Sequence, residues 1–117
     1  MGLRDMRRRL TASVEDLDAA RLQDRYSGLD LTSIGSMACR VPVRVGGEIK
    51  QLRVVPRAGS PSLQAILSDG SGELDVVFTG RRALGGVHPG RGMLVEGVAH
   101  QERGRMVIVN PAYTLLP

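Results

Sequence analysis

The sequence predicts an all-β fold, a small barrel of five strands preceded by an α-helix, and three observations point to it. Apolar and polar residues alternate in short runs between residues 41 and 109, as in strands that bury one face. Turns rich in glycine and proline separate these runs. Ahead of them, the first 26 residues place apolar residues at helical spacing instead. With 117 residues the chain is long enough for one domain, and we expect an N-terminal arm, helix and connector over 1–38 and a barrel over 39–117.

The expected helix covers residues 1–26. Its apolar face is formed by Leu10, Val14, Leu17 and Ala20. Thr11 or Ser13 can cap the start of a helix, and Asp16 follows Ser13 at the spacing of a capping box. Because the apolar face is modest, we expect it to pack on the barrel or on a second subunit.

The first predicted strand begins at Val41 and is interrupted by Gly46 and Gly47. Paired glycines inside a strand indicate a bulge or a sharp bend. The alternation then resumes with its phase shifted and ends near Val54, as expected after a bulge. Pro56, Gly59 and Pro61 predict a loop over 56–61.

The remaining strands are predicted at 63–68, 73–79, 93–100 and 105–109. Asp69-Gly70 begins the clearest turn, because Asp-Gly adopts the positive φ values of a tight hairpin. We expect a short helix within 80–88. Five strands with a helix between the third and the fourth are the layout of the oligonucleotide- and oligosaccharide-binding (OB) fold. An SH3-like barrel is the alternative, and it usually lacks that helix.

Two stretches carry a resemblance to a known family: residues 67–74 (LSDGSGEL) and the following Val77-Phe78. They resemble the hairpin in the OB wedge domain of the branched-DNA helicase RecG. The same order continues through Pro89-Gly90, 94–97 (LVEG), Gly104-Arg105 and 110–113 (NPAY). As a whole, the chain is similar to small stand-alone OB nucleic-acid-binding proteins of high-GC Gram-positive bacteria. The resemblance implies an OB barrel that binds nucleic acid. It does not imply branch splitting, because the sequence has no helicase motor and no second aromatic residue in the segment directly after Phe78, which reads Thr79, Gly80, Arg81, Arg82.

The charge of the chain permits a polyanionic partner. Sixteen basic residues against 12 acidic ones give a net charge of +4 and a pI near 10.2. All the basic residues except Lys50 are arginines, a bias that suits phosphate binding and that a GC-rich genome also produces. OB barrels bind ligands on the face of strands two and three, between the loops that join strands one to two and four to five. The candidate nucleic-acid-binding residues near that face are Lys50, Arg53, Arg57, Phe78, Arg81, Arg82, Arg103 and Arg105.

We expect the basic members of this set to follow a phosphate backbone by charge. The alternative for each of them is an ordinary solvated surface residue. Phe78 is either a stacking platform for a base or a core residue, since it shares a face with Leu74 and Val76. The Arg7–Arg9 run is either a phosphate-binding arm or a solubilising tail.

We expect no enzymatic activity, no cofactor and no metal site. His88 and His100 lack partners at ligand spacing, and the sequence has neither a phosphate-binding loop nor a nucleophile elbow. A single cysteine, Cys39, excludes an intrachain disulfide, which favours the cytoplasm, and no apolar run predicts a membrane span.

The leading interpretation is a non-enzymatic OB module that binds single-stranded or branched DNA, or RNA, weakly and through charge. The alternative is a protein-interaction or assembly module that uses the barrel and the N-terminal helix. A second copy of the chain or another protein is then its partner.

Overall fold

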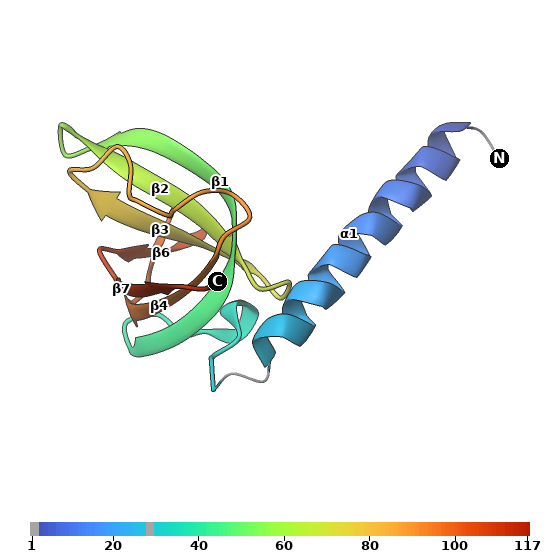
Figure 1. Cartoon of the computed structure of the whole chain (residues 1–117), viewed down its shortest axis with the longest axis horizontal. Helices are drawn as coiled ribbons and strands as arrows, with labels where there is room; N and C mark the ends of the chain where they lie inside the picture. Colours follow the sequence, from blue (N-terminus) through green and yellow to red (C-terminus); the bar gives the residue numbers. More distant parts are fainter. Residues whose placement is uncertain (1–2, 28–29) are drawn as a thin grey trace.

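The computed structural model describes the backbone of residues 3–27 and 30–117, and the side chains of residues 13–27 and 30–117. A long helix, α1 (Leu3–Ser27), and a short 3-10 turn, η1 (Ile34–Ser36), precede the strands (Figure 1). The strands of the described chain are β1 (Pro42–Arg57), β2 (Ser60–Ser68), β3 (Glu73–Thr79), β4 (Gly92–Val98), β5 (His100–Glu102), β6 (Arg105–Val109) and β7 (Ala112–Leu115).

The strands form one sheet in the order β5-β6-β3-β2-β1-β4-β7. Neighbouring strands are antiparallel except β3 and β6, which run parallel. Only Ala99 separates β4 from β5, so the chain itself joins the two sides of the sheet and closes a barrel. In this barrel β4 and β5 together are the fourth strand and β6 is the fifth, which is the topology of an OB fold. The prediction of an all-β OB barrel with an N-terminal helix is therefore confirmed.

Strand β7 was not predicted. The sequence suggested that Asn110-Pro111 ends the sheet, and the chain does leave β6 there. It then returns to pair antiparallel with β4, from Ala112 opposite Glu96 to Leu115 opposite Met93. This extra strand covers an edge of β4 that would otherwise have unpaired backbone groups.

Aliphatic residues fill the barrel. The inward positions of the strands alternate with outward ones, and Val45, Ile49, Leu67, Leu74 and Met93 are completely buried. A core of this kind needs few aromatic residues, because close-packed aliphatic side chains supply the buried area.

The bulge in β1 lies at Lys50 and not at the predicted Gly46-Gly47. The pairing with β2 shifts between Ile49 and Gln51, and the inward positions change phase there. The two glycines pair regularly with β4. They are needed for close packing: a Cβ on Gly46 would lie 2.6 Å from a methyl carbon of Leu94, and one on Gly47 would lie 2.7 Å from the carbonyl oxygen of Ser68.

Two predicted loop features are wrong. The expected loop at 56–61 is a tight hairpin, because Ala58 and Gly59 adopt φ values of 51° and 81°, which suit a two-residue turn between twisted strands. The expected helix within 80–88 does not form: the segment between β3 and β4 consists of bends and turns. Two of its glycines take left-handed conformations that end a helix, with φ of 72° at Gly80 and 78° at Gly86.

Helix α1 begins at Leu3 rather than at a cap near Thr11 or Ser13. Among its described side chains, those of its C-terminal part meet the barrel, where Leu22 and Tyr26 are 1% and 4% exposed. The rest extends away from the barrel as a rod (Figure 1), and the molecule measures 50 × 33 × 29 Å. No helix in the described part of the chain has the length and apolar character needed to cross a membrane.

The predicted apolar face of this helix does not pack on the barrel. Val14 and Leu17 are 64% and 71% exposed, and Ala20 is exposed too; Leu10 lies outside the described side chains. The contact is determined instead by Gly70 in the β2–β3 turn, where a Cβ would lie 2.1 Å from the carbonyl oxygen of Ala19. Because Gly70 has no side chain, the helix backbone can approach the turn closely at this point. The residues around Ala19 therefore face the barrel.

Candidate nucleic-acid interface

The face that OB barrels use for binding is the outward side of β2 and β3 together with the strands beside them. Strand pairing places Gln64, Val77 and Ile66 on this side, with Asp75 opposite Ile66 and Val107 opposite Asp75. All of these except Gln64 are at most 7% exposed. We call this side the outer face. Its centre is therefore largely buried, and not an open basic groove.

Arg57 is held by an ion pair with an acidic residue of β5. Its guanidinium binds both carboxylate oxygens of Glu102, and the Nη1–Oε2 distance is 3.1 Å. Nε2 of His100 lies 2.8 Å from Glu102 Oε1. Hydrogen bonds from Arg57 first and His100 second lower the pKa of Glu102 from 4.5 to about 2. Since Arg57 and Glu102 each directly precede the turn of a hairpin, this ion pair connects the β1–β2 hairpin with the β5–β6 hairpin.

Arg105 is also neutralised. Its Nε and Nη2 atoms donate to the two carboxylate oxygens of Asp75, at 2.8 and 2.7 Å, and Nη2 lies 3.5 Å from Glu73. The bidentate hydrogen bond to Asp75 raises the pKa of the Arg105 guanidinium. Because Asp75 is 4% exposed, Arg105 supplies the partner that a buried carboxylate needs.

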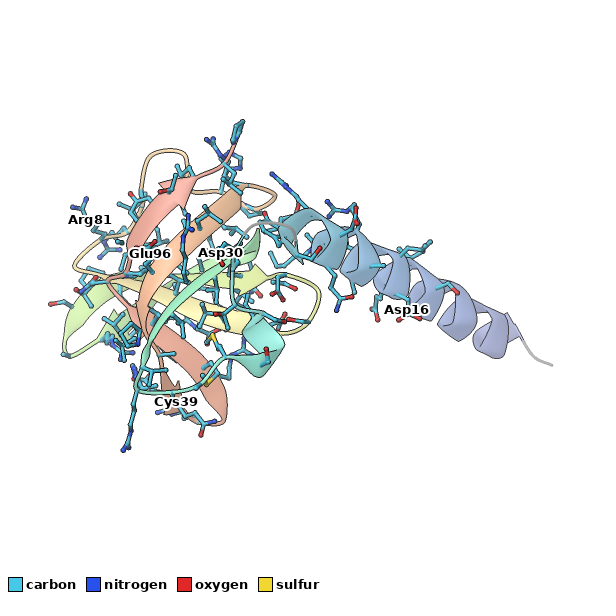
Figure 2. All side chains as sticks on the ribbon, turned by 90° about the horizontal axis from the view of Figure 1, so that it is seen from below. Asp16, Asp30, Cys39, Arg81 and Glu96 are labelled. Carbon is cyan, nitrogen blue, oxygen red and sulfur yellow. The ribbon has the colours of Figure 1, made fainter. Side chains whose placement is uncertain are left out.

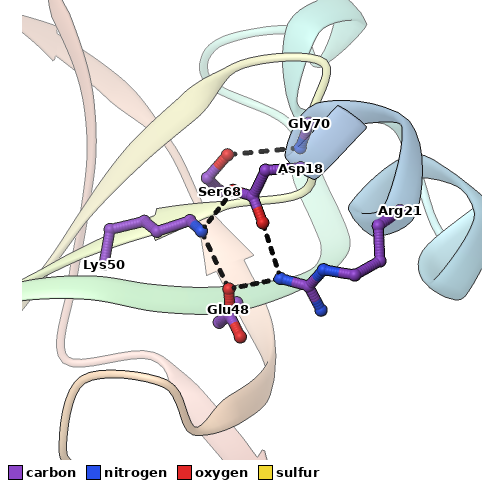
Figure 3. Close-up of polar contacts among 6 residues, drawn as sticks. All are labelled: Asp18, Arg21, Glu48, Lys50, Ser68 and Gly70. Carbon is purple, nitrogen blue, oxygen red and sulfur yellow. Dashed lines mark hydrogen bonds and ion pairs between the residues drawn. The ribbon is translucent and has the colours of Figure 1, made fainter. Parts of the chain in front are cut away.

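Lys50 joins α1 to the barrel. Its Nζ atom lies 2.8 Å from carboxylate oxygens of both Asp18 and Glu48, and Arg21 binds the same two acids (Figure 3). Hydrogen bonds from Lys50 first and Arg21 second lower the pKa of Asp18. The bulge at Lys50 turns its side chain toward the helix, so this residue lies apart from the outer face.

Phe78 lies in the core. It is 5% exposed, and its ring meets the ring of Tyr113 edge to face at a centroid distance of 5.3 Å. The core alternative for Phe78 is therefore the one that the structure supports, because a buried ring offers no face to a base.

The other four candidates are exposed arginines: Arg53, Arg81, Arg82 and Arg103. None of them has an ion pair or side-chain hydrogen bond with any residue that the structure describes. Arg53 and Arg82 line one hollow of about 170 Å³ with apolar walls that include Leu52, Val54 and Val87. Arg81 lies beside Arg82 on the barrel, away from the rod-like part of α1 (Figure 2). Arg103 occupies the β5–β6 turn with φ of 51°.

The sequence reasoning missed the acidic residues of this region. Asp75 and Glu102 neutralise two of the proposed phosphate-binding arginines. The alternation of β3 provides a signal for Asp75, since it is out of phase with the core residues Leu74 and Val76. Glu102 gave no such signal, because its pairing with Arg57 depends on how two distant hairpins meet.

Comparison with known proteins supports the fold. No family model and no curated protein matches this sequence. Among solved structures, a replication factor A related protein from Methanobacterium thermoautotrophicum is similar, with 16% identity, a TM-score of 0.57, and coverage of 75% of this chain and 92% of that chain. A chain of the Stn1–Ten1 complex of S. pombe matches with 20% identity and a TM-score of 0.53, over 64% of this chain and 57% of that chain.

At these identities the similarity establishes the shared fold. The finer resemblance, to the RecG wedge domain and to small proteins of high-GC Gram-positive bacteria, has no support in these matches and stays a prediction.

Proposed function

We propose that this protein is a non-enzymatic OB module that binds single-stranded or other non-duplex nucleic acid through charge. The observation that carries the proposal is a group of four exposed arginines on the barrel that have no acidic partner among the described residues: Arg53, Arg81, Arg82 and Arg103. Exposed guanidinium groups bind phosphate oxygens in planar, often bidentate geometry. The fold is one that often serves this purpose, and one of the similar structures is a replication factor A related protein.

The hollow beside Arg53 and Arg82 suggests how a strand would be held. Its apolar walls suit the flat face of a base, while the two guanidinium groups suit the phosphates on either side. With no exposed aromatic ring at this place among the described residues, stacking contributes little and we expect weak binding. Arg57 and Arg105 act in this proposal as structural partners of Glu102 and Asp75. We place this activity in the cytoplasm, since the single Cys39 can form no intrachain disulfide.

Fluorescence polarisation with labelled single-stranded, duplex and branched oligonucleotides at low salt tests this function. We expect the single-stranded and branched forms to bind and the affinity to fall steeply as salt increases. The absence of binding at low salt would refute the proposal, and an affinity that salt leaves unchanged would refute its electrostatic basis.

A further inference from the structure

The described part of helix α1 carries apolar side chains that the barrel leaves uncovered. Val14 and Leu17 are 64% and 71% exposed, and Ala20 is exposed as well. In the sequence, Leu3, Met6, Leu10, Ser13, Leu17 and Ala20 occupy the a and d positions of successive heptads. A surface helix normally turns such a row toward another element.

The charges of the same helix are divided into two blocks. The first block is basic, and consists of Arg4, Arg7, Arg8 and Arg9 against the single acid Asp5. The second block is acidic, and consists of Glu15, Asp16 and Asp18. Opposite charges support each other within a helix when they are three or four residues apart. No arginine of the first block has that spacing to an acid of the second block, so the two blocks do not neutralise each other within one helix.

We propose that α1 pairs with α1 of a second copy of this chain in an antiparallel two-helix coil. The two-fold axis passes between Thr11 and Ala12. In that register the heptad positions meet as Leu3 with Ala20, Met6 with Leu17 and Leu10 with Ser13, each pair occurring twice. The paired segment, residues 3–20, is about 27 Å long at 1.5 Å per residue.

The antiparallel arrangement follows from the charge blocks. It places the basic block of each helix beside the acidic block of its partner, and Arg9 and Asp16 both occupy g positions that flank the apolar seam. A parallel pair would instead place arginine against arginine and acid against acid. A nucleic-acid strand on this helix would neutralise the basic block alone and would be repelled by Glu15 and Asp16.

The rod is free to accept a partner. Asp16 lies on the part of α1 that stands clear of the barrel (Figure 2), and neither Glu15 nor Asp16 has an ion pair or side-chain hydrogen bond with a described residue. Asp18, the third acid of the second block, does have partners within the chain, since it binds Lys50 and Arg21. The proposal is independent of nucleic-acid binding, because it uses none of the barrel arginines.

Sedimentation velocity of the full chain over a roughly hundredfold range of concentration tests the pairing. We expect a monomer–dimer equilibrium whose dissociation constant rises about tenfold or more with Leu17→Glu. Val98→Glu is the matched control, since Val98 is an exposed valine on β4, 51% accessible and away from the rod. Circular dichroism establishes that each variant keeps its barrel.

Charge reversal tests the orientation. Asp16→Arg weakens the dimer, and adding Arg9→Asp to the same chain restores it, because the charges at the two flanking g positions are then exchanged and still complementary. In a Cys39→Ser background, a short bismaleimide joins two copies of Ser13→Cys near the axis but not two copies of Ala20→Cys.

Three results would each overturn the proposal: a chain that stays monomeric at the highest concentration, a dimer that Leu17→Glu leaves intact, or efficient cross-linking at residue 20.

Discussion

The replacement of Arg53 and Arg82 by alanine should reduce the salt dependence of nucleic-acid binding by half. These two arginines line the same hollow and have no acidic partner among the described residues. Their removal therefore takes away phosphate contacts without leaving a carboxylate unpaired. The two remaining unpaired arginines of the proposed interface, Arg81 and Arg103, continue to contact phosphates.

The magnitude follows from the number of contacts. Each phosphate contact to a single strand contributes about −0.7 to the slope of log K against log salt, so four arginines give about −2.8 and two give about −1.4. Between 50 and 200 mM salt, the unmodified protein should lose roughly 50-fold in affinity and the double variant roughly 7-fold.

Fluorescence polarisation with one labelled single strand, titrated at four salt concentrations, measures both slopes. Arg25→Ala with Arg44→Ala is the control, because it removes the same charge from residues that contact Tyr26 and Glu96, outside the hollow. We expect the control to leave the slope nearly unchanged. Equal slopes for both double variants would show that net charge, and not this group of arginines, drives the binding.

Three further outcomes follow from the structure. Phe78→Leu should lower the free energy of unfolding by about 1 kcal/mol and leave the dissociation constant for a single strand unchanged; a weaker affinity in the folded variant would show that the ring contacts a base. Gly70→Ala should lower the free energy of unfolding, measured in urea, by about 2–4 kcal/mol, whereas Gly59→Ala should lower it by about 1 kcal/mol. Both glycines have positive φ, but only Gly70 has backbone within 4 Å of an added Cβ, and equal effects would contradict the helix contact. The stabilisation lost in Glu102→Gln should be below about 1 kcal/mol, since the pair with Arg57 is partly exposed. Because folding lowers the pKa of Glu102 from 4.5 to about 2, this difference should be complete above pH 4.5 and vanish as the pH falls toward 2; a difference that grows on acidification would contradict the assignment.

The strands of the barrel could be predicted because their signals are local. Alternation identified β3 at 73–79 and β6 at 105–109 with the bounds that the structure gives. The Asp69-Gly70 turn was also clear, since a short loop with positive φ restricts the residues that fit. The same local reasoning misjudged Gly46 and Gly47, because glycine serves close packing as well as bulges, and the neighbour that requires it is distant in sequence.

The charged residues were harder to assign because their partners come from distant parts of the chain. Arg57 and Glu102 are 45 positions apart, and Lys50 and Asp18 are 32 apart. A sequence read locally presents each of these as a free surface charge. Pairing requires the barrel to be closed and α1 to be docked at Gly70, so three of the seven proposed basic residues, Lys50, Arg57 and Arg105, are in fact internal partners.

A dimer formed through α1 would carry two weak nucleic-acid-binding sites, one on each barrel, that can bind the same nucleic-acid strand. The proposed interface of each barrel has four unpaired arginines, so one barrel alone should bind weakly. Two barrels on a common rod raise the effective concentration of the second site to about the millimolar range once the first is bound. We therefore expect Leu17→Glu to weaken binding of a strand of roughly 40 nucleotides, which reaches both barrels, and to leave binding of one of about 10 nucleotides unchanged.

Polarisation with strands of both lengths, at protein concentrations where the unmodified chain is dimeric, measures this difference. Leu17 is remote from Arg53 and Arg82, so an equal loss for both lengths would mean that the substitution damages the barrel. An equal affinity for both lengths, in both proteins, would mean that the two barrels cannot engage one strand together. Since a short strand reports on one barrel and a long strand on two, the comparison separates the strength of a site from the number of sites that act together.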